Sequence, residues 1–240
     1  TAVSMIGVED PAADDTSEPS ILRKATKLTS VFPTLVAAQA RIQDGKDPIE
    51  PHPDLDHAAN YYYMLQGEVP TEIIRRTLEV TLMLYAEHET NASTFACRVV
   101  VGTLSDFYSA IVAGIGAIKG PLHGGAIEDS MKMFEEIGSP EAASQFVDQA
   151  LAGKRILPGF GHRVYKKGDP RAAELGNMAE SLGKSVGQEK WFDIAKNTER
   201  LKGRGLNPVK SSISKLNFRK DTSSGSAGSN KRKSDKMNKE

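Results

Sequence analysis

The sequence has little cysteine, no long apolar run and no excess of charge of either sign. Cys97 is the single cysteine among 240 residues, so an internal disulfide is excluded and we expect a reducing compartment. A run of about 18 apolar residues, as a transmembrane helix needs, does not occur. Basic and acidic residues each total 31, so no net charge attracts nucleic acid or an anionic membrane. We therefore expect a cytoplasmic protein, or one of an organelle matrix, without nucleic-acid or membrane partners.

Apolar residues recur at helical spacing along most of the chain, and alternation typical of a strand is confined to the short stretch 155–164. This pattern predicts an all-α protein. Helices are expected over 20–43, with a kink at Pro33, and over 54–66, 70–86, 127–137 and 188–201. Further helices are expected to start at Ala92, behind an N-cap at Ser105, at Pro140 and at Pro170. After Pro208 the apolar periodicity fades, and the last twenty residues offer almost nothing to bury, so we expect them to be disordered.

Two histidines lie between glycines, His123 in GPLHGGA and His162 in PGFGHRVY. Glycine has no Cβ and lets the backbone approach a bound molecule closely. A structural core histidine is the alternative, but it normally lies inside an apolar helical repeat rather than in a segment rich in breakers. With His88, the two histidines predict hydrogen-bond donors or acid–base groups for a carbonyl substrate. Arg163 and Arg171 predict carboxylate or phosphate binding, because the guanidinium fork holds such groups in bidentate fashion.

Two motifs of metal and nucleotide sites are incomplete. His88-Glu89 resembles the start of the zinc motif HExxH, but Ala92 stands where the second histidine belongs, so no metal is expected. The glycines of residues 114–120 form GxGxxxG within a helical repeat instead of GxGxxG after a strand. They predict close helix packing rather than a dinucleotide loop.

Four segments, in this order, resemble the citrate synthase family: HETNASTF at 88–95, SDFYSA at 105–110, GPLHGGA at 120–126, and 158–171, which ends in GDPR. The resemblance covers roughly residues 1–208. It implies an all-α fold with a large and a small helical domain that close over the substrates, in a homodimer. On this chain it implies that residues 1–142, with the His123 loop, are part of the large domain, 143–208 the small domain, and 209–240 a divergent basic tail.

The resemblance also implies a reaction, the condensation of acetyl-CoA with oxaloacetate followed by hydrolysis to citrate and CoA. His123 would stabilise the enol of acetyl-CoA by a hydrogen bond to its oxygen, and His162 would polarise the oxaloacetate ketone. His88 and Arg171 match positions that hold oxaloacetate carboxylates. The CoA adenine would lie near the backbone of Leu157, Pro158, Gly159, Phe160 and Gly161. Acetyl-CoA is then a substrate, and neither a permanently bound cofactor nor a metal is expected.

The chain departs from the family pattern after Pro208. Family members carry an aspartate there, in a stretch like Asp-Phe-Tyr-Ser, that removes the proton from acetyl-CoA, whereas this chain has 209–214 (VKSSIS) and no aspartate before Asp221. The family's later helices and a segment before Thr1 are also missing, so we expect a truncated chain of impaired activity. Two alternatives stay open, a 2-methylcitrate synthase that uses propionyl-CoA and a non-catalytic partner of a full-length citrate synthase subunit. Arg163 and 166–168 favour the citrate type.

Overall fold

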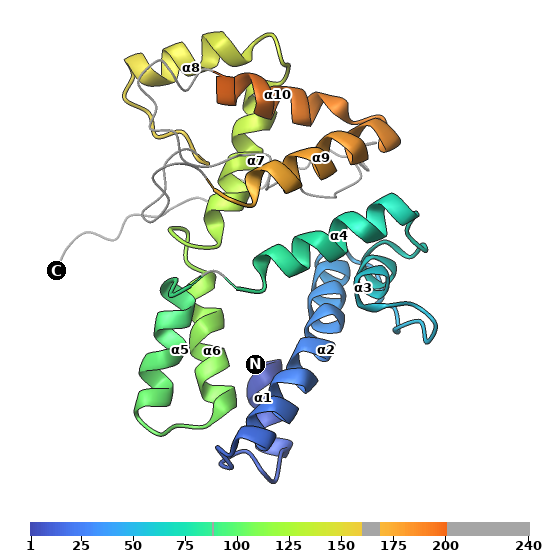
Figure 1. Ribbon diagram of the computed structural model, residues 1–240, viewed down its shortest axis with the longest axis vertical. Coiled ribbons are helices and arrows are strands. Elements are labelled where there is room, and N and C mark those ends of the chain that lie inside the picture. The colour runs from blue at the N-terminus through green and yellow to red at the C-terminus, as the bar shows by residue number, and fades with distance from the viewer. Residues whose placement is uncertain (88, 160–168, 201–240) are drawn as a thin grey trace, which may run out of the picture.

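A computed structural model describes residues 1–87, 89–159 and 169–200 of the chain. Within these ranges all regular structure is helical, which confirms the all-α prediction. Figure 1 shows two groups of helices, with α1 to α6 below and α7 to α10 above. The helices are α1 (Ala2–Glu9), α2 (Glu18–Gln43), α3 (His57–Gln66), α4 (Glu72–Tyr85), α5 (Ala92–Gly102), α6 (Phe107–Ile118), α7 (Gly125–Ile137), α8 (Ala143–Ala152), α9 (Ala172–Val186) and α10 (Glu189–Arg200).

Side-chain caps set where three of these helices begin. Asp56, Asn91 and Asp106 each accept a hydrogen bond of 2.9 Å from the backbone N–H three residues further on, at the starts of α3, α5 and α6. Such a cap satisfies one of the N–H groups that the first turn leaves without an intrahelical partner. At the other end, Gly67 closes α3 in the left-handed conformation with φ of 83°, which glycine adopts without a steric penalty.

Several expected boundaries were wrong by one to three residues. The N-cap of α6 is Asp106, not Ser105. Helix α8 begins at Ala143 rather than Pro140, because residues 140–142 form a turn, and α9 begins at Ala172 rather than Pro170. Pro33 lies inside α2, which runs without a break from Glu18 to Gln43. The short helix α1 was not expected from the sequence.

The lower group is built from pairs of neighbouring helices. Helix α2 packs on α3, α3 on α4, α1 on α6, and α5 forms a close hairpin with α6. A Cβ at Gly114 of α6 would lie 2.6 Å from Cys97 Sγ of α5, so only glycine fits at this crossing. Gly114 thus confirms the predicted close packing, whereas a Cβ at Gly116 would meet nothing within 4 Å.

The upper group has its own apolar core, to which α7, α8, α9 and α10 all contribute. Helix α9 also lies along α4, where Leu182 joins a cluster with Ile74 and Leu78, and so connects the two groups. The predicted division between residues 142 and 143 stays a prediction, although α7, which precedes it, packs with the helices that follow it. The buried members of the upper core are Met133, Phe134, Ile137, Ala143, Val147, Ala150, Leu157, Ala179, Phe192, Ile194 and Ala195.

A buried polar network joins α1, α2 and α6. The Tyr108 hydroxyl donates a hydrogen bond of 2.5 Å to Asp10 Oδ2, and Arg23 Nη2 lies 3.0 Å from the same oxygen. Lys24, fully buried, donates to the carbonyls of Ala13 and Asp15 at 2.7 Å each. The hydrogen bond from Tyr108 holds the pKa of Asp10 well below its usual range, and burial together with this bond raises the pKa of Tyr108 to about 12. The network therefore requires a charged Asp10 and a neutral Tyr108.

We expect Tyr108→Phe to lower the free energy of unfolding by about 1–3 kcal/mol at pH 7, because the Asp10 carboxylate loses a buried donor. Because its pKa is raised on folding, the Tyr108 hydroxyl contributes stability below its usual pKa of about 10 that is lost as pH rises towards 12. The stability difference between wild type and variant should therefore shrink between pH 10 and 12. Urea unfolding at several pH values measures it, and a constant difference over this range would contradict the role of the hydroxyl.

Candidate active site

The loop that carries His123 is a tight turn between α6 and α7. Gly124 N–H donates to Ile118 O at 2.9 Å, and His123 N–H donates to Gly120 O at 3.0 Å. A Cβ on Gly124 would lie 2.2 Å from Ile118 O, so the turn itself requires glycine after His123. Glycine was expected here to let a ligand approach, and the contact with Ile118 O gives a backbone reason for it that applies without a ligand.

The imidazole of His123 is held by the start of α5. Its Nε2 lies 2.9 Å from Ser93 Oγ, and Ser93 Oγ donates to Asn91 Oδ1 at 2.7 Å. The same Asn91 oxygen accepts the capping bond from Thr94 N–H. Asn91 therefore has two roles. It caps α5, and it is the first member of a series of hydrogen bonds that runs through Ser93 to His123.

The hydrogen bonds of Asn91, Ser93 and His123 constrain where the protons of this group lie. Asn91 Oδ1 can only accept, so the contact of 2.7 Å uses the single hydroxyl proton of Ser93. Ser93 Oγ must then accept from His123, which places a proton on Nε2. In a neutral imidazole that leaves Nδ1 as an acceptor. If the Ser93 hydroxyl turns to donate to Nε2 instead, a neutral ring carries its proton on Nδ1.

Arg171 forms a second cluster at the start of α9. Its Nε and Nη2 donate to the two carboxylate oxygens of Asp169 at 2.9 and 2.7 Å, a bidentate pair. The guanidinium carbon also lies 4.7 Å from the centre of the Tyr85 ring, at the end of α4. The Arg171 and Asp169 side chains are only 13% and 4% exposed, so the cation is largely withdrawn from solvent and its plane is fixed by two partners.

The segment between α4 and α5 connects these two clusters. Tyr85, the last residue of α4, contacts Arg171, and Asn91, the cap of α5, leads to His123. The six residue steps from Tyr85 to Asn91 can span at most about 20 Å, which limits the separation of the clusters. Within this segment Glu89 adopts φ of +53°, a left-handed conformation that is uncommon outside glycine and concentrates at functional sites.

The segment that the resemblance places near CoA begins in the core of the upper group. Leu157 is buried in the upper core, and the two Nη atoms of Arg155 donate to the two oxygens of Glu136 on α7 at 2.6 Å each. The Arg155 guanidinium also lies 5.1 Å from the centre of the Phe146 ring on α8. These contacts hold the chain on both α7 and α8 just before Pro158 and Gly159.

Several predicted site residues lie outside the described residues. These are His88, His162, Arg163, Phe160 and Gly161, and also the tail from residue 201 onward. His123, Arg171, Leu157, Pro158 and Gly159 are described. In the described ranges no group of three or more histidine, cysteine, aspartate or glutamate side chains could hold a metal ion. Likewise, none of the described helices is long and apolar enough to cross a membrane.

Sequence reasoning missed the partners of the predicted residues. Asn91, Ser93 and Asp169 lie within the segments that resemble the family, but none of them was predicted to hold a site residue. Tyr85 carries no motif at all. The short spacing of Asp169-Pro170-Arg171 was the one available signal, since a carboxylate two residues before an arginine can meet its side chain.

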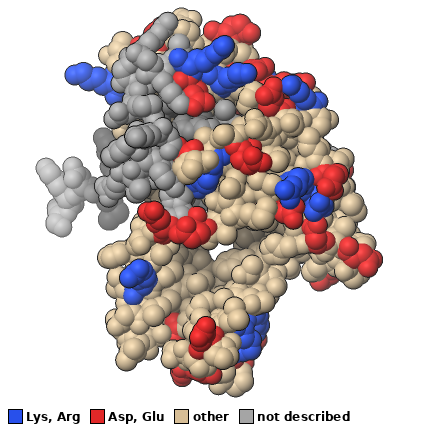
Figure 2. Space-filling model, viewed as in Figure 1, with Lys and Arg blue, Asp and Glu red and all other residues tan. Residues whose placement is uncertain are grey.

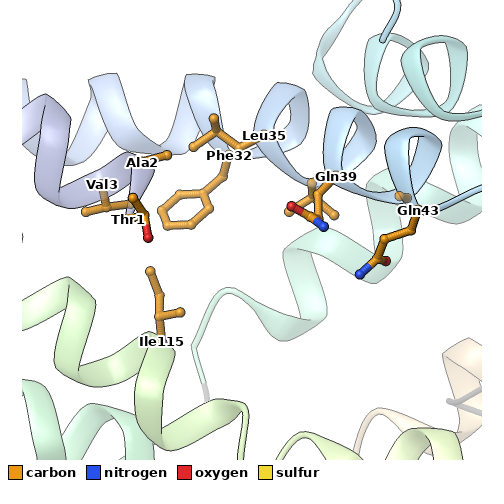
Figure 3. A pocket seen from close by; sticks show the side chains of 10 residues that line it. Thr1, Ala2, Val3, Phe32, Leu35, Gln39, Gln43 and Ile115 are labelled. Carbon is orange, nitrogen blue, oxygen red and sulfur yellow. The ribbon is translucent and has the colours of Figure 1, made fainter. Parts of the chain in front are cut away.

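A hollow of the described surface lies away from these clusters. It has a volume of about 380 Å³ and lies between α1, α2 and α6 (Figure 3). Its lining includes no histidine, arginine or acidic side chain, so it offers nothing to bind or polarise a dicarboxylate. The lining residues are Thr1, Ala2, Val3, Phe32, Leu35, Val36, Gln39, Ala40, Gln43 and Ile115.

Known proteins match most of the chain. The family model of the citrate synthase C-terminal domain covers residues 1–218. Citrate synthase 2 of Bacillus subtilis is 48% identical over 195 residues, 81% of this chain and 52% of that protein. The 2-methylcitrate synthase of Mycobacterium tuberculosis is 44% identical over 194 residues, 81% of this chain and 49% of that protein. The chain spans about half the length of these curated relatives.

A solved structure with the same fold was determined with ligands bound. It is the citrate synthase of the thermophilic archaeon Thermoplasma acidophilum, in a ternary complex with carboxymethyl coenzyme A and oxaloacetate. It superimposes with a TM-score of 0.78 at 31% identity, over 89% of this chain and 58% of that one. Both the sequence and the arrangement of helices are therefore shared with this group of proteins.

We expect Ser93→Ala to change the protonation pattern of the His123 ring, because it removes the acceptor for the Nε2 proton. Long-range ¹H–¹⁵N NMR spectra of the imidazole distinguish the two tautomers, and the share with the proton on Nδ1 should rise. The capping bond of Asn91 is kept, so far-UV circular dichroism should stay the same. Ser109→Ala, a matched change in the first turn of α6, should leave the His123 signals where they are. Identical His123 spectra in wild type and Ser93→Ala would contradict the proton assignment.

Proposed function

Because the chain belongs to the citrate synthase family, we propose that it condenses acetyl-CoA with oxaloacetate to citrate and CoA. The family match and the shared fold confirm the family and the fold class expected from the sequence. One observation supports the proposal most directly, the hydrogen-bonded chain from Asn91 through Ser93 to His123. It fixes the ring of the histidine that the family resemblance assigns to the enol. A cytoplasmic or organelle-matrix location remains part of this proposal.

The proposed reaction forms one carbon–carbon bond and breaks one carbon–sulfur bond. A base removes a proton from the methyl carbon of acetyl-CoA, and His123 donates a hydrogen bond to the enol oxygen that develops. The enol carbon attacks the oxaloacetate ketone, whose oxygen takes a proton from His162. Water then cleaves the thioester and releases CoA. His88 and Arg171 hold the oxaloacetate carboxylates, and residues 157–161 lie along the adenine of CoA.

His123 can donate to the enol oxygen through Nδ1 once the proton lies on that nitrogen. In the arrangement inferred from the heavy-atom distances, Ser93 directs its proton at Asn91, and His123 uses Nε2–H towards Ser93. We infer that the Nε2 proton passes to solvent water and a water proton is taken up at Nδ1 when the thioester binds, while the Ser93 hydroxyl turns from Asn91 to donate to the bare Nε2, which leaves Nδ1–H directed at the ligand. The ring loses one proton and gains one, so its charge is the same before and after the switch.

The proposal includes a low turnover, because the chain carries 209–214 where family members carry the aspartate base. The proton from the methyl carbon then has no positioned side chain to accept it, and general-base catalysis typically contributes a factor of about 10²–10⁴. Oxaloacetate and acetyl-CoA binding depends on other residues and can persist without the base.

The assay of CoA release from acetyl-CoA plus oxaloacetate tests this function. We expect slow release that depends on oxaloacetate, and His123→Gln should reduce it at least about 100-fold because the enol oxygen loses its donor. His57→Gln at the start of α3, remote from the His123 loop, is the matched control and should keep the wild-type rate. Release without dependence on oxaloacetate would reject the reaction, and turnover at the level of full-length enzymes would reject the proposed loss of the base.

A 2-methylcitrate synthase, which uses propionyl-CoA, is the second candidate. The relative from Mycobacterium tuberculosis that carries this name is 44% identical to the chain, which supports 2-methylcitrate synthase activity as a second candidate. Competition between acetyl-CoA and propionyl-CoA in the same assay distinguishes the two. A higher kcat/KM for the propionyl thioester would replace the first proposal by the second.

We further propose that the chain assembles as a homodimer, as the resemblance implies. Large apolar side chains are exposed on helices of the lower group, including Leu22 and Val36 of α2 at 66% and 48% and Phe95 of α5 at 61%. On the face shown in Figure 2, the region of α5 and α6 is mostly uncharged. Such patches mark interfaces more often than solvent-facing surface. Sedimentation velocity should give a dimer. A monomer that co-purifies with a full-length citrate synthase subunit would instead support the non-catalytic partner.

A further inference from the structure

We propose that Tyr85 is a positioning residue for dicarboxylate binding, which acts by fixing the plane of the Arg171 guanidinium. The inference rests on the proposed function, since it assigns the oxaloacetate carboxylate to Arg171. No motif in the sequence includes Tyr85, and its ring reaches Arg171 only because α4 and α9 lie side by side (Figure 1).

Two partners define the orientation of the guanidinium. Asp169 takes one edge of the group, formed by Nε and Nη2, at 2.9 and 2.7 Å. The guanidinium carbon lies over the Tyr85 ring, 4.7 Å from its centre. We infer that the guanidinium stacks parallel to the ring, which would keep its N–H donors in one plane. The carboxylate thus limits rotation within the plane, and the ring limits tilting out of it.

The packing of α4 against α9 brings Tyr85 to Arg171. The two helices run in opposite directions, as three contacts along them show. Ile74 shares a cluster with Leu182, Thr77 Oγ1 lies 3.9 Å from Met178 Sδ, and Tyr85 meets Arg171. The last residue of α4 therefore lies beside the first turn of α9, and the chain that follows Tyr85 carries His88. The ring thereby ties the end of α4 to Arg171, which is proposed to hold oxaloacetate.

The stack matters for a carboxylate ligand because bidentate recognition depends on the plane of the fork. A ligand carboxylate would meet the guanidinium along its end edge, formed by the two Nη atoms, and both hydrogen bonds shorten together only if that edge is coplanar with the carboxylate. The Arg171–Asp169 pair is neutral overall and largely buried, so Arg171 does not lose its position when Tyr85 changes. The change we expect is a loss of orientation and hence of affinity.

Tyr85 is 38% exposed, so its replacement leaves no large cavity. We expect Tyr85→Leu to weaken oxaloacetate binding about threefold to thirtyfold in isothermal titration calorimetry, the range of a cation–π contact between an exposed and a desolvated site. Tyr85→Phe keeps the ring and should bind like wild type. CoA binding, titrated separately, should be the same in all three proteins.

Tyr63→Leu on α3 is the matched control. The Tyr63 ring packs edge-on against His52 with ring centroids 5.7 Å apart, so the variant also loses an aromatic contact but leaves Arg171 untouched. It should keep the oxaloacetate affinity of wild type. An equal loss of affinity in Tyr63→Leu and Tyr85→Leu would reduce the effect to a general loosening of the fold and overturn the proposal.

A spectroscopic measurement without ligand tests the geometry itself. The ring current of Tyr85 should move the side-chain N–H signal of Arg171 upfield in the ¹H–¹⁵N spectrum, and Arg171→Lys identifies that signal. Tyr85→Phe should keep the shift and Tyr85→Leu should remove it.

The combination separates the possible failures. If wild type binds oxaloacetate and Tyr85→Leu binds it equally well, the positioning role is rejected and the proposed function stands. If wild type does not bind oxaloacetate, the proposed function fails and this inference with it, whatever the spectrum shows. A signal that does not respond to Tyr85→Leu would reject the stack directly.

Discussion

The hydrogen bond between Ser93 and His123 is the contact on which the proposed chemistry depends. It joins the first turn of α5 to the turn between α6 and α7, and both elements are fixed by other means. Asn91 caps α5 at Thr94, and Gly124 closes the turn on Ile118. Because the two attachment points are rigid, the imidazole is oriented by the fold before any ligand arrives, and such preorganisation avoids a reorganisation cost during reaction. The close crossing at Gly114 and Cys97 holds the two helices in this register.

The sequence predicted the fold class and most helices because the apolar repeats are long and the caps are chemically distinct. The predicted helix boundaries are wrong at helix starts where neighbouring residues are equally suited to be the cap or the first helical residue. Ser105 and Asp106 are both good N-caps, and only the backbone conformation shows that Asp106 accepts the bond from Ser109. Pro140 and Pro170 are suited to a first helical turn, but in the structure each lies in a turn that precedes its helix. The helix of residues 2–9 has a weak apolar repeat, and its position depends on Tyr108, which is about a hundred residues away along the chain.

The site was predictable in part, and the limit is again long-range packing. The histidine–glycine segments and the arginine of Gly-Asp-Pro-Arg carry their chemistry in the residue types and in the resemblance. Tyr85 and Ser93 gain their roles from helices that meet only in the folded chain, so no local pattern indicates that Tyr85 covers Arg171. Asp169 lies between these cases, since its nearness to Arg171 is local, but the bidentate geometry depends on the turn before α9.

The two clusters differ in how they are stabilised, and the difference suits their proposed tasks. The group around His123 consists of hydrogen-bonding partners that allow two proton patterns, one with the Ser93 proton directed at Asn91 and the ring proton on Nε2, the other with the Ser93 proton directed at Nε2 and the ring proton on Nδ1. The Arg171 group consists of a buried ion pair and an aromatic face, and separating a buried pair leaves an uncompensated charge. A proton must move during enol formation, whereas a carboxylate must be held in one place throughout. The short segment from Tyr85 to Asn91 joins the fixed group to the movable one along the chain.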